Sequence, residues 1–208
     1  MKKIFILLTA VLFGFGLQEA NAQKQKGVVI NGVTWATCNV DAFRKFATAP
    51  ESAGMFYQWN QPTAWAAKGK VKDWDDSFPI NRTWEAVNDP CPSGWHVPSI
   101  TEIKTLLDTN NVCSEWVKQN GVNGRIFTDI STNNSIFLPA VGYRYGDDGK
   151  RDDAGKRGYY WSCAVYDHNI AHSLVFGRGG ISYYGFNKTD GYSVRCVLRE
   201  ETITEVIR

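Results

Sequence analysis

Residues 161–191 contain most of the side chains in this sequence that could recognise a ligand. Apolar residues alternate there with tyrosine, histidine, serine, asparagine and arginine. Tyrosine gives a large contact area at a small entropic cost, while amide, hydroxyl and imidazole groups form adaptable hydrogen bonds. Outward-facing polar positions of ordinary strands and hairpin loops explain the pattern at least as well. We predict a ligand-binding surface made of Tyr166, His168, Asn169, His172, Arg178, Ser182, Tyr183, Tyr184 and Asn187.

The three histidines do not predict catalysis or metal binding. His168 and His172 have the i, i+4 spacing that joins zinc ligands on a helix, but their segment is typical of loop and strand. His96 lies in a Gly-Trp-His-Val-Pro string, where a structural role is favoured. A hydrolytic triad needs a nucleophile beside a base, and the histidines are poorly placed to provide one. We predict no catalytic residues, no metal and no cofactor.

An acidic cluster is the other candidate for a cation site. Its four carboxylates could gather a hard cation such as calcium: Asp147, Asp148, Asp152 and Asp153. Four cationic side chains are interleaved with them: Lys150, Arg151, Lys156 and Arg157. Because these neutralise the carboxylates, the pattern favours a solvated turn.

The five cysteines are Cys38, Cys91, Cys113, Cys163 and Cys196. Their wide spacing allows neither a redox Cys-x-x-Cys motif nor a local zinc knuckle. An odd number leaves at least one thiol unpaired in a monomer. Their spacing alone does not say which of them pair.

The first 22 residues have the features of a secretory signal peptide. Lys2 and Lys3 precede an apolar run, and Ala20-Asn21-Ala22 fits the small-x-small cleavage rule. A retained membrane anchor is the alternative, but the run is short for a span. Gln23 follows the cleavage point, whereas a lipoprotein needs cysteine there. We predict a secreted protein with no stable membrane insertion after cleavage.

Composition and charge indicate one globular domain. The chain has 208 residues, 43% of them hydrophobic and 21% charged. That is too apolar for a disordered chain. The 23 basic and 21 acidic residues give a net charge of +2, too small to indicate binding to nucleic acid.

The order of predicted elements indicates an α+β fold. Residues 28–35 read as a hairpin around Asn31-Gly32, and residues 41–95 as long loops pinned by tryptophans. A capping box at Ser99–Glu102 predicts the main helix over residues 99–108. Turn-forming residues separate six predicted strands after residue 124: 125–130, 135–138, 159–166, 171–176, 181–186 and 193–198. Residues 200–208 look like a polar tail.

Six sequence blocks occur in a fixed order along the chain. They are Trp-Ala-Thr-Cys-Asn-Val from residue 35, Ala-Gly-Met-Phe-Tyr-Gln-Trp from 53, Asp-Pro-Cys-Pro-Ser-Gly-Trp-His-Val-Pro from 89, Phe-Leu-Pro-Ala from 137 with Gly-Tyr-Arg from 142, Gly-Tyr-Tyr-Trp-Ser from 158 and Ser-Val-Arg-Cys-Val from 193. These blocks resemble the Fibrobacter succinogenes major paralogous domain family, and the resemblance covers residues 23–199 as a single domain. It implies a C-type-lectin-like fold in secreted or surface proteins, in the periplasm or on the outer surface of a Gram-negative bacterium, and supplies no reaction.

The resemblance also implies a disulfide between Cys91 and Cys196, because the cysteines of their two blocks recur together. Cys163 stands where the family usually has serine, and Cys113 lies outside every block; these two could form an extra bridge. The calcium-binding motifs of lectins, Glu-Pro-Asn, Gln-Pro-Asp and Trp-Asn-Asp, do not occur in the sequence.

Together these features predict a non-enzymatic binding or adhesion domain that recognises a glycan or a protein outside the cytoplasm. Two alternatives stay open: a carbohydrate-active enzyme with an unrecognised site, and a structural component of the cell envelope.

Overall fold

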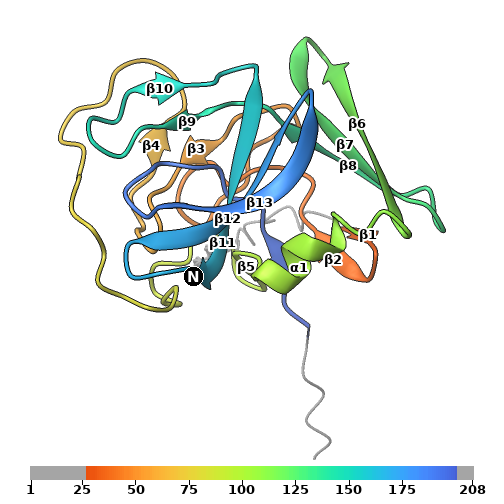
Figure 1. Cartoon of the computed structure of the whole chain (residues 1–208), viewed down its shortest axis with the longest axis horizontal. Helices are drawn as coiled ribbons and strands as arrows, with labels where there is room; N and C mark the ends of the chain where they lie inside the picture. The colour runs from red at the N-terminus through yellow and green to blue at the C-terminus, as the bar shows by residue number, and fades with distance from the viewer. Residues whose placement is uncertain (1–26, 201–208) are drawn as a thin grey trace, which may run out of the picture.

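The computed structural model describes residues 27–200 (Figure 1). This part of the chain contains fourteen strands and one short helix, joined by turns and loops. The predicted signal peptide and residues 201–208 of the predicted tail lie outside the described residues. No helix of the described part is long and apolar enough to cross a membrane.

The N-terminal hairpin forms as predicted and joins the two ends of the domain. Asn31 and Gly32 both have positive φ, which the tight turn between its two strands requires. The hairpin continues into a four-stranded sheet of order β1-β2-β14-β5. The strands are β1 (Val28–Ile30), β2 (Val33–Trp35), β5 (Trp95–His96) and β14 (Val197–Leu198).

Two three-stranded antiparallel sheets contain the longest strands. The first consists of β6 (Val112–Gln119), β7 (Val122–Asp129) and β8 (Ser135–Pro139). The second consists of β11 (Arg157–Val165), β12 (Ile170–Gly177) and β13 (Gly180–Asn187), and it crosses the front of the molecule in Figure 1. The predicted strands over residues 125–186 are thus confirmed. Of the strand predicted at 193–198, only β14 forms.

Long ordered loops and two short strand pairs build the remainder. The pairs are β3 (Met55–Phe56) with β4 (Trp65–Ala66), and β9 (Tyr143–Arg144) with β10 (Arg151–Asp152). Aromatic side chains hold the loop after β4, as predicted. The Trp74 indole lies 4.8 Å from that of Trp65 and donates a hydrogen bond to the Gly146 carbonyl.

The predicted α+β class is wrong, because the main helix is a single short segment. Helix α1 covers only Ile100–Thr105. Its capping box forms as predicted, since the Ser99 hydroxyl accepts from the Glu102 amide and the Glu102 carboxylate accepts from the Ser99 amide. The helix ends early because Asp108 accepts from the Asn110 amide and the Asn111 side chain, which starts a turn into β6.

The described residues therefore form a nearly all-β fold. The C-type-lectin-like architecture that the resemblance implied is not shown by this arrangement.

The implied disulfide is confirmed, whereas the extra bridge does not form. Cys91 and Cys196 are bonded across 105 residues of sequence and link the segment before β5 to the segment before β14. Cys113 and Cys163 are free thiols. They lie on β6 and β11, which belong to different sheets, so the strand positions keep them apart.

Candidate functional site

The predicted recognition residues divide between the two faces of the β11-β12-β13 sheet. Directly opposed residues share a face and successive residues alternate. Leu174 opposes Tyr183, and both belong to the core under α1. Ala171 opposes Phe186, and both belong to the second core around Trp161. Consequently the predicted residues do not form one continuous surface.

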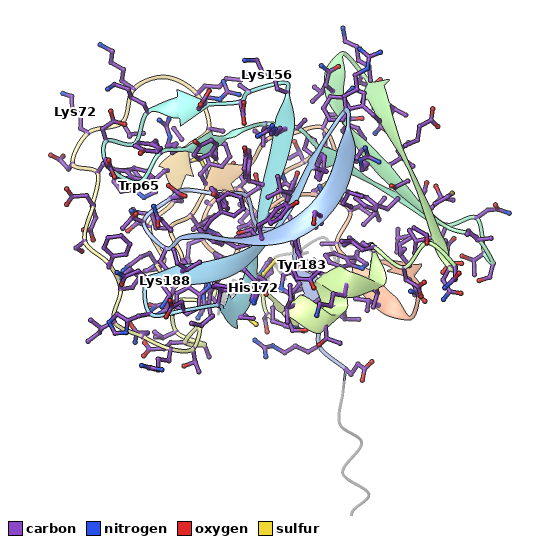
Figure 2. The ribbon with its side chains drawn as sticks, viewed as in Figure 1. Trp65, Lys72, Lys156, His172, Tyr183 and Lys188 are labelled. Carbon is purple, nitrogen blue, oxygen red and sulfur yellow. A yellow bond between two sulfur atoms is a disulfide. The ribbon has the colours of Figure 1, made fainter. Side chains whose placement is uncertain are left out.

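The face toward α1 brings together Tyr166, His172 and Tyr183. The His172 ring lies 5.1 Å from that of Tyr166 and 6.0 Å from that of Tyr183, and Lys104 of α1 places its ammonium over the Tyr183 ring. Figure 2 shows His172 and Tyr183 close to α1. Burial, together with the Lys104 charge, lowers the pKa of His172. Packing between the sheet and α1 uses these side chains, which supports a structural role for Tyr183.

His168 and Asn169 have a structural role through their carbonyl groups. They lie in the turn between β11 and β12, where the buried Lys188 contacts both. The Lys188 ammonium donates to the carbonyls of His168 and Asn81, and its backbone amide donates to the Asn169 carbonyl. The same ammonium lies 4.5 Å from the ring centre of Trp59. Lys188 thereby ties three loops together.

Of the other predicted residues, Ser182 and Tyr184 lie on the opposite face, whereas Arg178 and Asn187 lie beyond or at the ends of strands. Arg178 is exposed in the turn between β12 and β13. Ser182 and Tyr184 share a face with Phe186, and 58% of the Tyr184 surface is exposed. Asn187 lies at the end of β13 and lines a pocket.

This aromatic pocket is the best-formed candidate site, with a volume of about 320 Å³. Ligand pockets begin at about this size. Rings from four segments surround it at centre-to-centre distances of 4.7 Å (Tyr143 to Tyr159), 5.1 Å (Tyr159 to Tyr192) and 5.6 Å (Phe186 to Tyr192). Its lining consists of Tyr143, Tyr145, Tyr159, Ile170, Gly185, Phe186, Asn187, Asp190 and Tyr192.

Short backbone bridges position these rings. Arg144, next to Tyr143, exchanges both backbone hydrogen bonds with Gly191, so β9 is fixed against the segment after β13. Tyr192 exchanges both bonds with Tyr57, whose carbonyl also accepts from the Trp161 indole. Paired backbone hydrogen bonds therefore hold the pocket walls against the core.

One carboxylate, Asp190, lies among the rings and is 5% exposed. It accepts from the Gly146 amide at 2.8 Å and from the Tyr192 hydroxyl at 3.1 Å. Burial, with a smaller contribution from the charge of Asp147, raises its pKa from 3.8 to about 6. A buried carboxylate with a raised pKa in a concave site is a candidate functional group.

Burial also raises the pKa of two phenols beside the pocket. The pKa of Tyr159 rises to about 12 because of burial and its hydrogen bond to Asp153. The pKa of Tyr143 rises because of burial and the charges of Asp190, Asp152 and Asp153. Both phenols therefore stay protonated at neutral pH and can donate hydrogen bonds.

We expect Asp190→Asn to stabilise the folded chain at neutral pH. Between pH 3.8 and 6 the folded state holds a proton that the unfolded state has lost, so wild-type stability falls as pH rises through this window. The asparagine variant lacks this loss and should be more stable by about 2–3 kcal/mol at pH 7.5. Urea unfolding at pH 7.5 and pH 4 measures the difference, which should fall below about 1 kcal/mol at pH 4. Equal stability at pH 7.5 would contradict the raised pKa.

A larger hollow of about 640 Å³ lies elsewhere, but it lacks aromatic side chains. Small residues such as Ala53, Gly54 and Ala66 form much of its lining, and Lys68, Lys118 and Arg151 are its basic members. Its one carboxylate, Glu51, already accepts from the Gln119 and Asn120 side chains. The smaller pocket combines aromatic rings with the buried carboxylate of Asp190, so it is the stronger candidate.

The described residues contain no group of three or more histidine, cysteine or carboxylate side chains that could hold a metal ion. The acidic residues of the 147–153 turn bond locally. Asp148 accepts from the Lys150 amide and ammonium, and Asp153 accepts from the Tyr159 hydroxyl.

Comparison with known families decides the classification. The model of the Fibrobacter succinogenes major domain matches residues 21–198. The chain belongs to this family. All lining residues of the pocket fall within the matched range of the major domain. A search of the curated proteins gives no match, and a search of the solved structures gives none.

Sequence reasoning missed most of the pocket of this major domain. Of its nine lining residues, only Asn187 belongs to the predicted surface. Tyr143 and Tyr159 stand in two of the blocks that carried the family resemblance, Gly-Tyr-Arg and Gly-Tyr-Tyr-Trp-Ser. That recurrence of tyrosine was the available signal. Nothing in the sequence marks Asp190 as buried.

Proposed function

We propose that this major domain is a non-enzymatic binding domain that recognises a glycan outside the cytoplasm, and that the aromatic pocket is its binding site. The observation that carries the proposal is the convergence of four tyrosines and Phe186 on one hollow that also contains Asp190 and Asn187. Aromatic faces pack against the apolar faces of sugar rings, and carboxylate and amide groups bond to hydroxyls. The predicted signal peptide supports the extracytoplasmic location.

The position of the rings favours binding in the pocket over binding across the whole sheet. Tyr145 is 47% exposed at the pocket and can contact a ligand directly. Tyr166 is 67% exposed but lies on the α1 side of the sheet, beside His172. These two exposed tyrosines therefore form a matched pair for testing which face binds.

A glycan array with the purified chain, followed by calorimetry on the sugars retained, tests this proposal. We expect Tyr145→Ala to weaken binding about tenfold or more, because the contact between the Tyr145 ring and the bound sugar is lost. Tyr166→Ala should leave the affinity unchanged. If Tyr166→Ala loses binding and Tyr145→Ala keeps it, the ligand binds on the α1 face of the sheet and not in the pocket. Binding of no sugar, together with concentration-dependent self-association, would favour a structural role in the cell envelope.

A further inference from the structure

The charged side chains at the aromatic pocket are carboxylates. Asp190 is the only charged residue among the nine that line it. Asp147 raises the pKa of Asp190, and Asp152 and Asp153 join Asp190 in raising the pKa of Tyr143, so further carboxylates lie near the same space.

The neighbouring cationic side chains, Arg144 and Arg157, already bind other groups of the protein. Arg144 follows Tyr143 in sequence, but its buried guanidinium donates to the carbonyls of Ala66, Gly149 and Gly69. Arg157 is paired with Asp153, at 3.6 Å. Neither residue lines the pocket, and within residues 27–200 the Asp190 carboxylate accepts from two neutral donors, Gly146 N–H and Tyr192 O–H.

The rings add to the negative potential of the pocket. The face of an aromatic ring is electron-rich and attracts a cation placed within about 6 Å of its centre. The ring centres of Tyr143, Tyr159, Tyr192 and Phe186 lie 4.7–5.8 Å apart in five of their pairs, so these rings pack against one another. A cation in the pocket, against this ring cluster, is close to several rings at once. A cation there would gain from the rings and from the carboxylate together.

We propose that the group bound in this pocket is positively charged, and that the glycan recognised is one with free amino groups, such as an unacetylated amino-sugar oligomer. This inference rests on the proposed glycan-binding function and narrows its ligand class. A neutral sugar would leave the buried carboxylate without an opposite charge, whereas an ammonium group supplies one.

Cation binding should require ionised Asp190. The groups that face its carboxylate are the Gly146 amide, the Tyr192 hydroxyl, Asp147 and Tyr143, none of which supplies a positive charge. With a pKa of about 6 for Asp190, nearly all of it is ionised at pH 7.5 and about a tenth at pH 5. The affinity for a permanent cation should therefore fall about tenfold between these pH values.

Two sets of ligands separate this inference from the broader function. The first is choline, a permanent cation without a sugar ring. The second is a series of oligomers of glucosamine, N-acetylglucosamine and glucose, in which acetylation or a hydroxyl removes the charge. We expect choline binding with the stated pH dependence, and tighter binding of glucosamine oligomers than of the other two at pH 7.5.

Asp190→Asn is the decisive variant because it removes the charge and keeps the shape. It should lower the affinity for choline and for glucosamine oligomers about tenfold and abolish the pH dependence. Glu115→Gln, an equal change of net charge on the exposed side of β6, should change neither. Circular dichroism at each pH shows that the variants are folded.

Each result points to one conclusion. Equal binding of all three oligomers without choline binding would overturn the cationic ligand and leave glycan recognition standing. Choline binding that survives Asp190→Asn would overturn the role of the carboxylate. Choline binding without any oligomer binding would support the cationic pocket and remove the glycan from the proposed function.

Discussion

Replacing Arg195 by alanine should cost about 3–5 kcal/mol of folding stability, more than any other single side-chain truncation considered for this protein. Arg195 is almost fully buried, and its guanidinium bonds twice to the Asn39 side-chain oxygen and once each to the carbonyls of Ala36 and Thr37. Truncation leaves two buried acceptors and the partly buried Thr37 carbonyl without this donor, and it opens a cavity. Urea denaturation followed by tryptophan fluorescence measures the loss.

Arg178 supplies the control for this measurement. It is exposed in the turn between β12 and β13, and Arg178→Ala makes the same chemical change without removing a buried contact. We expect its stability to stay within about 0.5 kcal/mol of wild type. A loss of less than 1 kcal/mol in Arg195→Ala would show that the segment 36–39 does not depend on the guanidinium.

Buried cations of this kind are a feature that sequence patterns hide. Arg144, Lys188 and Arg195 are each at most 1% exposed, although charged side chains are normally at the surface. Each of them donates to backbone carbonyls of loops. Long loops leave carbonyls without strand partners, and a multi-donor cation satisfies several at once. Sequence alone shows the charge but not the loops that fold around it.

Local signals predicted the strands well because the turn chemistry is explicit. Asn31-Gly32 was recognised as a hairpin turn and adopts the positive φ values expected. Asn120-Gly121 has the same signature and connects β6 to β7, but β6 was not predicted. The sequence of β6, Val-Cys-Ser-Glu-Trp-Val-Lys-Gln, places apolar and polar residues in pairs rather than in alternation, so its periodicity does not indicate a strand. The Asn-Gly turn was the available signal there.

The helix was predicted too long because its stop depends on side-chain bonding. The apolar stripe of Ile100, Ile103, Leu106 and Leu107 continues past the last helical residue, Thr105. Leu106 and Leu107 instead donate to carbonyls three residues earlier, which tightens the last turn before Asp108 redirects the chain. A periodic stripe fixes the buried face of a helix but does not fix its end.

The candidate site was only partly predictable because it joins segments that are distant in sequence. Alternation within residues 161–191 places neighbours on opposite faces, but it does not say which face another segment covers. Packing against α1 covers Tyr183, and the approach of Tyr143 and Tyr192 makes the hollow on the other side. Such information comes from tertiary contacts rather than from strand periodicity.

Removing the Cys91–Cys196 disulfide is the second change with a large expected effect. The bond closes a loop spanning 105 residues of sequence, and the chain-entropy model gives a stabilisation of about 4–5 kcal/mol for a loop of that size. We expect the Cys91→Ala, Cys196→Ala double variant to lose stability of this order, because its unfolded chain gains freedom and the ends of the domain are no longer linked. Urea unfolding of the oxidised wild type and the variant measures the difference.

Cys113→Ser controls for a general effect of removing sulfur. Cys113 is exposed on β6 and free, so its replacement should leave stability within about 0.5 kcal/mol. Reduction of the wild type should reproduce the loss seen in the double variant, since both remove the same constraint from the unfolded chain. If the reduced wild type and the double variant both unfold at the same urea concentration as the oxidised protein, the backbone bridges of β2 and β14 hold the two ends together without the disulfide.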